Sequence, residues 1–594
     1  MVVPIGNDGD KQNNEFLPPG NFTTHRQSSG DGMMTPEQAV AHLTSTDPRF
    51  ALTEADINGV SYRVFANAPA SLRELLDQAG PAYNGRDVLV YQDERWNHAQ
   101  LCEEVKRLAN ALASELGVKP GEPVAMAMRN YPELLILILA VSALGAVAVP
   151  MNAWWTAEEL EYGFKDSGAR IAFVDGERQQ RIAPFADKLG LTVVAVRDAQ
   201  AERRYDDLRQ AGDGHAWPDI TIDTDDDFAI IYSSGSTGNP KGVVLTHRGA
   251  IASVYSRVMA SQVGPLVMDP PPPPPPEDLS ALVITPLFHV TALHALAFNG
   301  ITIGCTLVLM YKWDAEEAVR IIERENITHF TGVPTQSADL MAAAEQMGAK
   351  LSSLRTIAAG GAKRPAAQVD ELAEAFPEAA IASGWGMTET NSLGITLIGP
   401  DYLTHPEAVG RPTPPVQDFR IVDNDGQDVA LGEIGELIVK SPTNMRCYHN
   451  LPKETADTLR DGWLYTGDLA RQDEEGLFYI VDRKKSIILR GGENISCLEV
   501  EGVLHRHAAV LEAGVFPIPD QRLGETVGAC VYLHPDSDVN DVELKYFTRM
   551  HLAKFKVPER IWLRYTPLPR GGTDKIDRRA LRTECLADLV TTEH

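Results

Sequence analysis

The chain lacks the features that define several large classes of protein. Its six cysteines are scattered over 594 residues, with no CxxC pair and no cysteine–histidine spacing typical of a metal site. Neither a disulfide framework nor a zinc site is therefore predicted, and reduced thiols favour a cytosolic protein. Basic residues are outnumbered by acidic ones. The chain has 54 Lys and Arg and 82 Asp and Glu, which gives a net charge of −28. This balance argues against a general nucleic-acid or anionic-membrane surface.

Long hydrophobic runs are also missing. The longest, residues 134–149, is interrupted by Ser142 and Gly145 and is shorter than the roughly 20 residues that a spanning helix needs. It predicts a buried helix, a glycine turn and a strand over residues 146–150. The N-terminus has no basic-then-apolar signal pattern, so we expect a cytoplasmic protein with no integral membrane segment.

What remains is a soluble globular composition, 44% hydrophobic and 23% charged. Strand-like apolar runs alternate with amphipathic helical patterns, for example at 96–116 and 315–325, which predicts an α/β fold with largely parallel sheets. Residues 1–34 are rich in Asn, Gly, Asp, Ser and Gln, which predicts a disordered tail. The run Pro270 to Pro276 predicts extended polyproline II. A stiff surface loop is favoured over a ligand for a proline-binding domain, because no basic residue flanks the run.

The most informative segment runs from Ser233 to Gly242, with the sequence SSGSTGNPKG. Apolar residues at 227–232 and 243–245 predict buried strands on either side. A loop that combines hydroxyls, backbone N–H groups and one lysine is suited to holding phosphate oxygens. It is not a Walker A loop, because Pro240 precedes Lys241 and Gly242 follows it. Nucleotide chemistry is therefore the first hypothesis, with a flexible surface turn as the alternative.

Further polar or glycine-rich segments follow this loop in order along the chain. Thr388 could bond a phosphate and Glu389 could ligate Mg²⁺, while Asp468, expected on a turn, could accept bonds from ribose hydroxyls. Taken singly, each has an ordinary explanation, such as core packing for His289 and a surface turn for Asp468. The segments are 286–289, 358–362, 384–390, 465–468, 482–494 and 568–578.

Together, these segments make the chain resemble the adenylate-forming superfamily, most closely the fatty-acyl-CoA ligases, over about residues 75–582. The resemblance implies a large domain over residues 35–484 and a small mobile α+β domain over 485–594, with the hinge near Lys485. It also implies that a carboxylic acid attacks the α-phosphate of ATP and that CoA then displaces AMP.

The resemblance further implies a role for each matching residue. Lys575 would be the catalytic lysine, Thr388 would contact the α-phosphate, Glu389 would bind Mg²⁺, and His289 would lie near the acyl carboxylate. Gly491 and Gly492 would lie beside the pantetheine tunnel. The remaining nucleotide-binding residues would be the phosphate clamp Ser233, Ser234, Gly235, Ser236, Thr237, Gly238 and Lys241, the adenine side Gly360, Gly361, Ala362, Trp385 and Gly386, and the ribose partners Asp468 and Arg483.

We therefore expect an AMP-forming ligase for a medium- or long-chain fatty acid that uses ATP, Mg²⁺ and CoA, with no nucleic-acid partner and with a homodimer left open. The alternatives are another acid (aryl or sulfur-containing), loading of a carrier protein, a luciferase-like reaction, or a non-catalytic acyl-nucleotide-binding protein. Three positions depart from the family pattern. Asp574 and Ala292 stand where relatives often have glycine, and Trp385 replaces the more usual tyrosine.

Overall fold

The computed structural model describes residues 33–233, 240–268, 271, 274, 276–484, 486–490, 493–535, 537–571 and 575–592. Several predictions therefore lie outside the described residues. They concern residues 1–32, 234–239, the hinge Lys485, the pair Gly491 and Gly492, Asp574, and most of the proline run.

The first large sheet is built around the chain's most apolar segment. Helix α4 (Pro132–Ala143) is buried on almost every side, the left-handed Gly145 (φ 68°) turns the chain, and β6 (Val147–Met151) enters the sheet, as the sequence predicted. The sheet runs in the order β21 (Cys447–Tyr448), β11 (Lys241–Thr246), β10 (Asp227–Ser233), β6, β5 (Pro123–Ala127), β7 (Ile171–Val174), β8 (Thr192–Ala195) and β9 (Arg203–Arg204).

The second large sheet is parallel through its centre, which confirms the predicted α/β class. Crossover helices alternate with its strands, so the carboxyl ends of β14, β15 and β16 lie along one edge, where α/β proteins bind ligands. The order is β18 (Arg411–Pro412), β17 (Gly394–Ile398), β16 (Ala380–Gly386), β15 (Thr356–Gly360), β14 (His329–Gly332), β12 (Ser280–Val283), β13 (Thr306–Leu309), β3 (Asp87–Tyr91) and β4 (Glu94–Asn97).

A third, antiparallel sheet corrects one prediction. Asp468 was expected on a turn but lies within β23 (Trp463–Gln472), and its side chain is buried. Gly467 takes a left-handed conformation (φ 72°) inside the strand, which explains why the Thr-Gly-Asp pattern suggested a turn. The sheet contains β19 (Asp418–Val422), β20 (Gly435–Lys440), β23 and β22 (Leu459–Arg460), with β24 (Phe478–Arg483) also paired to β23.

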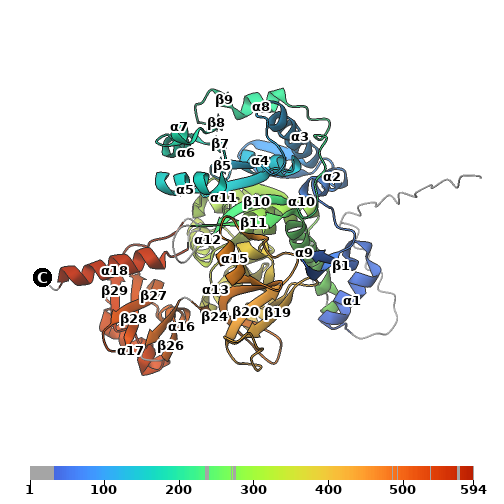
Figure 1. The fold of residues 1–594 in the computed structure, drawn as a ribbon. Coiled ribbons are helices and arrows are strands. Elements are labelled where there is room, and N and C mark those ends of the chain that lie inside the picture. The colour runs from blue at the N-terminus through green and yellow to red at the C-terminus, as the bar shows by residue number, and fades with distance from the viewer. Residues whose placement is uncertain are drawn as a thin grey trace, which may run out of the picture.

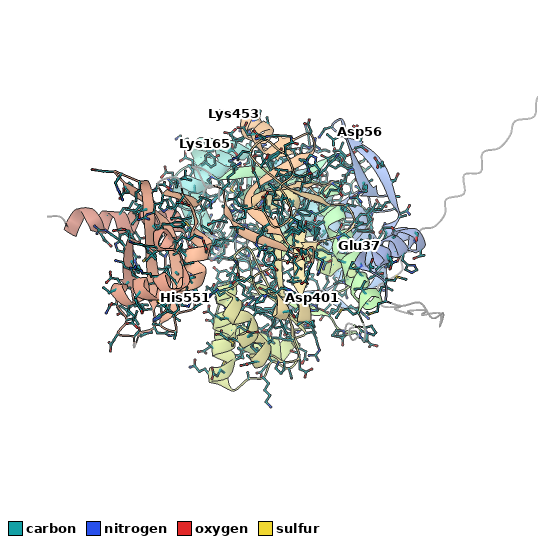
Figure 2. The ribbon with its side chains drawn as sticks, turned by 90° about the horizontal axis from the view of Figure 1, so that it is seen from below. Glu37, Asp56, Lys165, Asp401, Lys453 and His551 are labelled. Carbon is teal, nitrogen blue, oxygen red and sulfur yellow. The ribbon has the colours of Figure 1, made fainter. Side chains whose placement is uncertain are left out.

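The small C-terminal domain has its own sheet and core and stands to one side of the large domain (Figure 1). In Figure 2, His551 of this domain and Glu37 of the N-terminal helix lie on opposite sides of the molecule. The predicted boundary near residue 485 falls between β24 and the first strand of this sheet. Its strands are β25 (Ile487–Arg490), β26 (Glu493–Ser496), β27 (Val510–Asp520), β28 (Gly524–Leu533) and β29 (Arg560–Arg564).

Helices cover the faces of the sheets (Figure 1). Two strands near the N-terminus, β1 (Leu52–Ile57) and β2 (Val60–Phe65), form a separate hairpin. The remaining helices are α1 (Pro36–Thr46), α2 (Leu72–Ala82), α3 (His98–Ser114), α5 (Ala157–Ser167), α6 (Gly176–Ile182), α7 (Ala186–Leu189), α8 (Tyr205–Ala211), α9 (His247–Val267), α10 (Asn299–Ile303), α11 (Ala315–Glu325), α12 (Pro334–Met347), α13 (Ala366–Ala375), α14 (Pro400–Thr404), α15 (Pro452–Thr458), α16 (Cys497–Leu504), α17 (Asp541–His551) and α18 (Arg578–Thr592).

Helix length and hydrophobicity also bear on the membrane prediction. Among the described residues, no helix combines the length and the apolar character that crossing a bilayer requires. The residues of α4 are instead covered by the neighbouring elements of the large domain.

Truncating a side chain inside α4 should destabilise the large domain. Leu137 is fully buried, so Leu137→Ala is expected to cost about 2–5 kcal/mol in the free energy of unfolding, through lost burial and a residual cavity. Urea titration of the large-domain transition measures the change. The control Val542→Ala, at a side chain 69% exposed on α17, should stay within about 0.5 kcal/mol of wild type. Equal shifts for the two variants would contradict this account of the core.

Candidate active site

The two strands that flank the predicted phosphate loop form an antiparallel pair. Ser233 at the end of β10 lies opposite Lys241 at the start of β11, as the sequence predicted for the strands themselves. The Ser233 hydroxyl donates to the carbonyl oxygen of Lys241 at 3.5 Å. The ends of the loop are thus fixed by strand pairing, while residues 234–239, which carry most of the predicted clamp, lie outside the described part of the chain.

Tyr448 joins the loop lysine to the predicted metal ligand. The Nζ of Lys241 lies 4.5 Å from the centre of the Tyr448 ring, within the range of a cation–π contact. The Tyr448 hydroxyl donates to Oε1 of the buried Glu389 at 2.8 Å. Burial raises the pKa of Tyr448, and the Glu389 carboxylate raises it further, so the phenol remains a donor. Sequence reasoning missed Tyr448, because its segment contains no recognisable motif. Pairing of β21 with β11 brings the residue to the site.

Glycines form an open surface at the ends of two parallel strands. Gly360 of β15 and Gly384 of β16 lie side by side in register. A Cβ on Gly360 would meet only the Gly384 carbonyl oxygen, at 3.9 Å, so the backbone here is accessible to a flat group. Ala362 and Gly386 are exposed nearby in sequence. Gly384, Trp385 and Gly386 form the last three residues of β16, although glycines on both sides of Trp385 suggest a turn.

Trp385, Asp468 and Arg483 form one hydrogen-bonded unit. The indole Nε1 of Trp385 donates to Oδ2 of Asp468 at 2.8 Å, and Nε of Arg483 lies 2.9 Å from Oδ1. Burial raises the pKa of Asp468, whereas Arg483 and the indole bond lower it. The sequence suggested Trp385 as an adenine wall; the structure shows in addition that its indole orients the carboxylate predicted to bind ribose.

Lys575 of the small domain reaches this surface of the large domain. Its Cε lies 3.0 Å and its Nζ 3.3 Å from the position that a Cβ on Gly361 would occupy. Lys575 as a residue is exposed to solvent, while the surrounding protein partly desolvates its ammonium group. Burial lowers its pKa to about 8, with Arg483 contributing to the decrease and Asp468 opposing it. Residues far apart in sequence are thus brought together as predicted.

His289 lies close enough to Lys575 to be influenced by its charge. Its Nε2 is buried without a hydrogen-bond partner among the described residues. Burial lowers the pKa of His289 to about 3, and Lys575 lowers it further, so the imidazole is neutral at physiological pH. The ring packs against Phe288, with ring centres 4.9 Å apart. A neutral, unpartnered nitrogen beside an ammonium group could bond a substrate oxygen.

A strained turn holds Thr388 and Glu389. Directly after the short helical turn Thr388–Thr390, Asn391 (φ 52°) and Ser392 (φ 60°) both adopt left-handed conformations. Such conformations persist only when their surroundings enforce them. Here the half-buried Arg257 of α9 donates to the backbone and hydroxyl oxygens of Ser392. Sequence reasoning missed Arg257, since an arginine within a helix gives no sign of this role.

The donor set fits ATP with Mg²⁺ better than it fits a protein-only metal centre. Within the described residues, no three His, Cys, Asp or Glu side chains converge on one point. Glu389 supplies a single buried carboxylate, which matches the one or two that Mg²⁺ takes alongside phosphate oxygens and water. When bound, the ion would neutralise phosphate charge.

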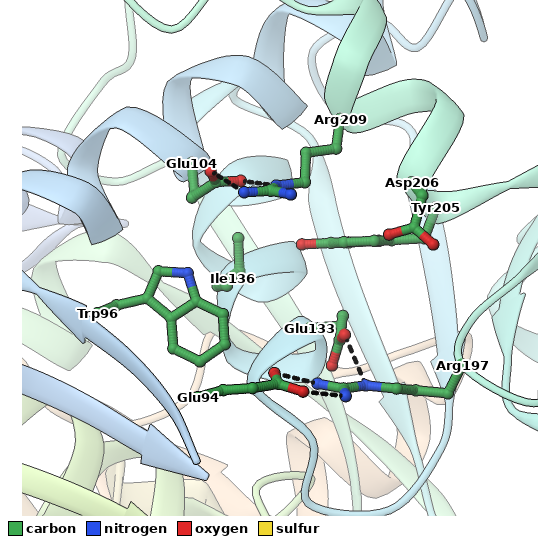
Figure 3. A pocket seen from close by; sticks show the side chains of 9 residues that line it. All are labelled: Glu94, Trp96, Glu104, Glu133, Ile136, Arg197, Tyr205, Asp206 and Arg209. Carbon is green, nitrogen blue, oxygen red and sulfur yellow. Dashed lines mark hydrogen bonds and ion pairs between the residues drawn. The ribbon is translucent and has the colours of Figure 1, made fainter.

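A cavity of about 340 Å³ lies apart from these groups and is shown in Figure 3. Arg197 pairs there with both Glu94 and Glu133, at 2.5 and 2.7 Å. Arg209 pairs with Glu104 at 2.5 Å. Three of the four carboxylates that line it thus pair with its two arginines, and no described residue of the candidate site lines it. We assign it a structural role.

The sequence matches two known families of protein domains. The model of the AMP-binding enzymes matches residues 76–449, more than half of the chain, and that of the AMP-binding enzyme C-terminal domain matches residues 499–575. The chain belongs to this family. It is an ATP-dependent, adenylate-forming acyl- or aryl-CoA ligase of mixed α/β fold.

Individual relatives differ in the acid that they use. A feruloyl-CoA synthase from Amycolatopsis is 34% identical over 82% of this chain and 93% of its own length. A long-chain-fatty-acid–CoA ligase from Bacillus subtilis is 30% identical over 86% and 94%. The o-succinylbenzoate-CoA synthetase of Bacillus subtilis, solved with ATP and a magnesium ion, is 30% identical and covers 86% of this chain and 99% of its own, with a TM-score of 0.72.

Removing the indole donor should weaken nucleotide use. Trp385→Phe keeps an aromatic ring but leaves Oδ2 of Asp468 without its 2.8 Å partner. We expect kcat/KM for ATP to fall roughly tenfold, equivalent to about 1.5 kcal/mol for a hydrogen bond to a charged group. The matched control is Trp217→Phe. The indole of Trp217 donates to Oδ2 of Asp77 at 2.6 Å, and neither residue belongs to the candidate site. An equal loss in both variants would refute the assignment.

Proposed function

We propose that this ligase activates a carboxylic acid with ATP to an acyl-adenylate and pyrophosphate, and then transfers the acyl group to CoA with release of AMP. The observation that carries the proposal is the placement of Lys575. A cation from the small domain lies against Gly361 of the large domain, in the field of Asp468 and Arg483. Charge that accumulates on the α-phosphate during attack would be stabilised there.

The other groups support this chemistry. Glu389 would hold Mg²⁺, Thr388 would bond the α-phosphate, and Asp468 with Arg483 would hold the ribose. The Ser233–Lys241 segment would bind the outgoing pyrophosphate. His289, neutral and with an unpartnered Nε2, would bond the acyl carboxylate. The second half-reaction would place CoA near residues 491 and 492, outside the described part of the chain.

The acid is proposed only as a class: a largely apolar monocarboxylic acid. The prediction of a medium- or long-chain fatty acid is supported by the relative named as a long-chain-fatty-acid ligase. A hydroxycinnamic acid is the second candidate, supported by the relative named as a feruloyl-CoA synthase at 34% identity. Pyrophosphate release with palmitate, decanoate, ferulate and o-succinylbenzoate, each with and without CoA, distinguishes them. An acyl group that reaches only a carrier protein would refute the CoA-ligase proposal.

Lys575→Ala should abolish most of the first half-reaction. Loss of one charge-stabilising group in a preorganised site costs about 10²–10³-fold in rate. Acid-dependent pyrophosphate release in a single turnover measures this directly. The control Lys556→Ala removes a lysine that pairs with Glu499 within the small domain at 2.7 Å, and should leave the rate unchanged. Near-wild-type adenylation by Lys575→Ala would show the assignment to be wrong.

The pH dependence should report the same lysine. Its pKa is lowered to about 8, chiefly by burial, so the ammonium form predominates below that pH and is lost above it. We therefore expect kcat/KM for adenylation to hold steady toward pH 7 and to fall about tenfold per unit above pH 8. An ordinary lysine would postpone the fall beyond pH 10. A profile that is flat to pH 9.5 would contradict the prediction.

A further inference from the structure

The segment that carries Lys575 is a short hairpin, formed by residues 569–571 and 575–577 and called here the Lys575 hairpin. The backbone N–H of Gly571 donates to the Lys575 carbonyl oxygen at 2.8 Å, and that of Asp577 donates to the Pro569 carbonyl oxygen at 2.7 Å. Arg570 lies opposite Ile576 across it. The backbone position of Lys575 therefore depends on whatever holds this hairpin.

On the side of the small domain, Glu512 of β27 holds the hairpin. Its Oε2 accepts from the backbone N–H of Leu568 at 2.9 Å, and its Oε1 accepts from the guanidinium group of Arg570. Both side chains of the ion pair are largely buried, at 10% and 21% exposure, so the pair is stronger than a typical surface salt bridge. The hairpin is thus fixed firmly to its own sheet.

On the side of the large domain, the contact is made by Arg570 itself. Its Nη1 lies 3.4 Å from Oγ1 of Thr335, in the first turn of α12. Helix α12 directly follows β14, which is paired in the sheet with β15 that ends at Gly360. The same hairpin therefore touches the large domain at two neighbouring points, through Arg570 at Thr335 and through Lys575 at Gly361.

The contacts of Arg570 with Glu512 and with Thr335 differ in strength. A bond of 3.4 Å to a neutral hydroxyl is weak, and the amino end of a helix disfavours a cation. The Glu512 carboxylate offsets that charge within the small domain. Asp339, one turn further along α12, accepts from the indole of Trp313 at 2.9 Å; burial raises its pKa, whereas the Trp313 bond and Arg570 lower it and Glu512 raises it. The contact of Arg570 with Glu512 in the small domain is thus stronger than its contact with Thr335 in the large domain.

We propose that Arg570 is a positioning residue that seats the Lys575 hairpin on α12 for adenylate formation and releases it afterwards. This role rests on the proposed function, in which Lys575 acts only in the first half-reaction. In this proposal Arg570 acts through the hairpin and not by contact with a reacting group. A defect confined to adenylation is the signature that a merely structural arginine would not give.

The kinetic test separates the two half-reactions. Arg570→Gln should slow acid-dependent pyrophosphate release at least tenfold, while thioester formation from a synthetic acyl-adenylate and CoA stays within about threefold of wild type. Thr335→Val removes only the interdomain acceptor, so a two- to tenfold loss in the first step is expected, as for one long and weak hydrogen bond. Arg570→Lys can pair with Glu512 but lacks the planar fork, so it should recover part of the rate.

Arg564→Gln serves as the matched control, because Arg564 pairs with Glu584 inside the small domain at 2.7 Å. It should leave both half-reactions unchanged. Equal losses in both half-reactions for Arg570→Gln, or no loss in either, would overturn the proposal. A wild-type enzyme inactive with every acid would instead refute the proposed function.

A second measurement tests the seating without any substrate. Hydrogen–deuterium exchange should increase in peptides covering residues 334–340 and 568–571 in Arg570→Gln and Thr335→Val, but not in Arg564→Gln, because the first turn of α12 would lose its cover. Unchanged exchange in those peptides would overturn the proposal whatever the activity.

Discussion

The site depends on one electrostatic arrangement, in which a lysine of the small domain lies against Gly361 of the large domain. The ammonium group of Lys575 is partly desolvated, lies near the cation Arg483, and is supported by Asp468. Desolvation favours the uncharged form, and the carboxylate restores part of the balance, so the pKa lies near 8. A bound triphosphate would add negative charge and favour the ammonium form. The group is therefore most fully charged when the nucleotide is in place.

The carboxylate that supports Lys575 is itself held by two donors. Trp385 and Arg483 each bond one oxygen of Asp468, and both come from strands. Strand positions fix a side chain more tightly than a turn would, which suits a group predicted to bind a sugar and placed to balance a lysine. Arg483 ends the last strand before the small domain begins, so the same ion pair lies at the segment where the domains join.

A similar set of contacts holds the residues that are predicted to bind the phosphates and Mg²⁺. Tyr448 lies between Lys241 and Glu389, contacting the first through its ring and the second through its hydroxyl. The opposite charges of the lysine and the carboxylate are thereby held apart, although both are predicted to belong to one phosphate site. Arg257 then secures the strained turn after Glu389 from behind. Among the described residues, contacts between the two domains include the polar approach of Arg570 to Thr335 and the approach of Lys575 to Gly361.

Much of this was determined by the sequence itself. Alternating apolar patterns predicted the α/β class, the strands around the phosphate loop, and the helix–turn–strand unit of α4 and β6, because local periodicity reports burial directly. The order of the motifs identified the family. The roles of the individual residues stay predictions, although the structure brings Lys575, Gly361, Asp468 and Arg483 together.

Only the tertiary structure could decide the rest. Asp468 lies in a strand and not on a turn, since a left-handed glycine inside a sheet has the same local sequence as a turn. Tyr448, Arg257 and Thr335 belong to segments with no motif, and they reach the site through strand pairing and packing over long sequence separations. Spacing along a chain reports neighbours on one element, whereas the meeting of two domains depends on surfaces that no local pattern records.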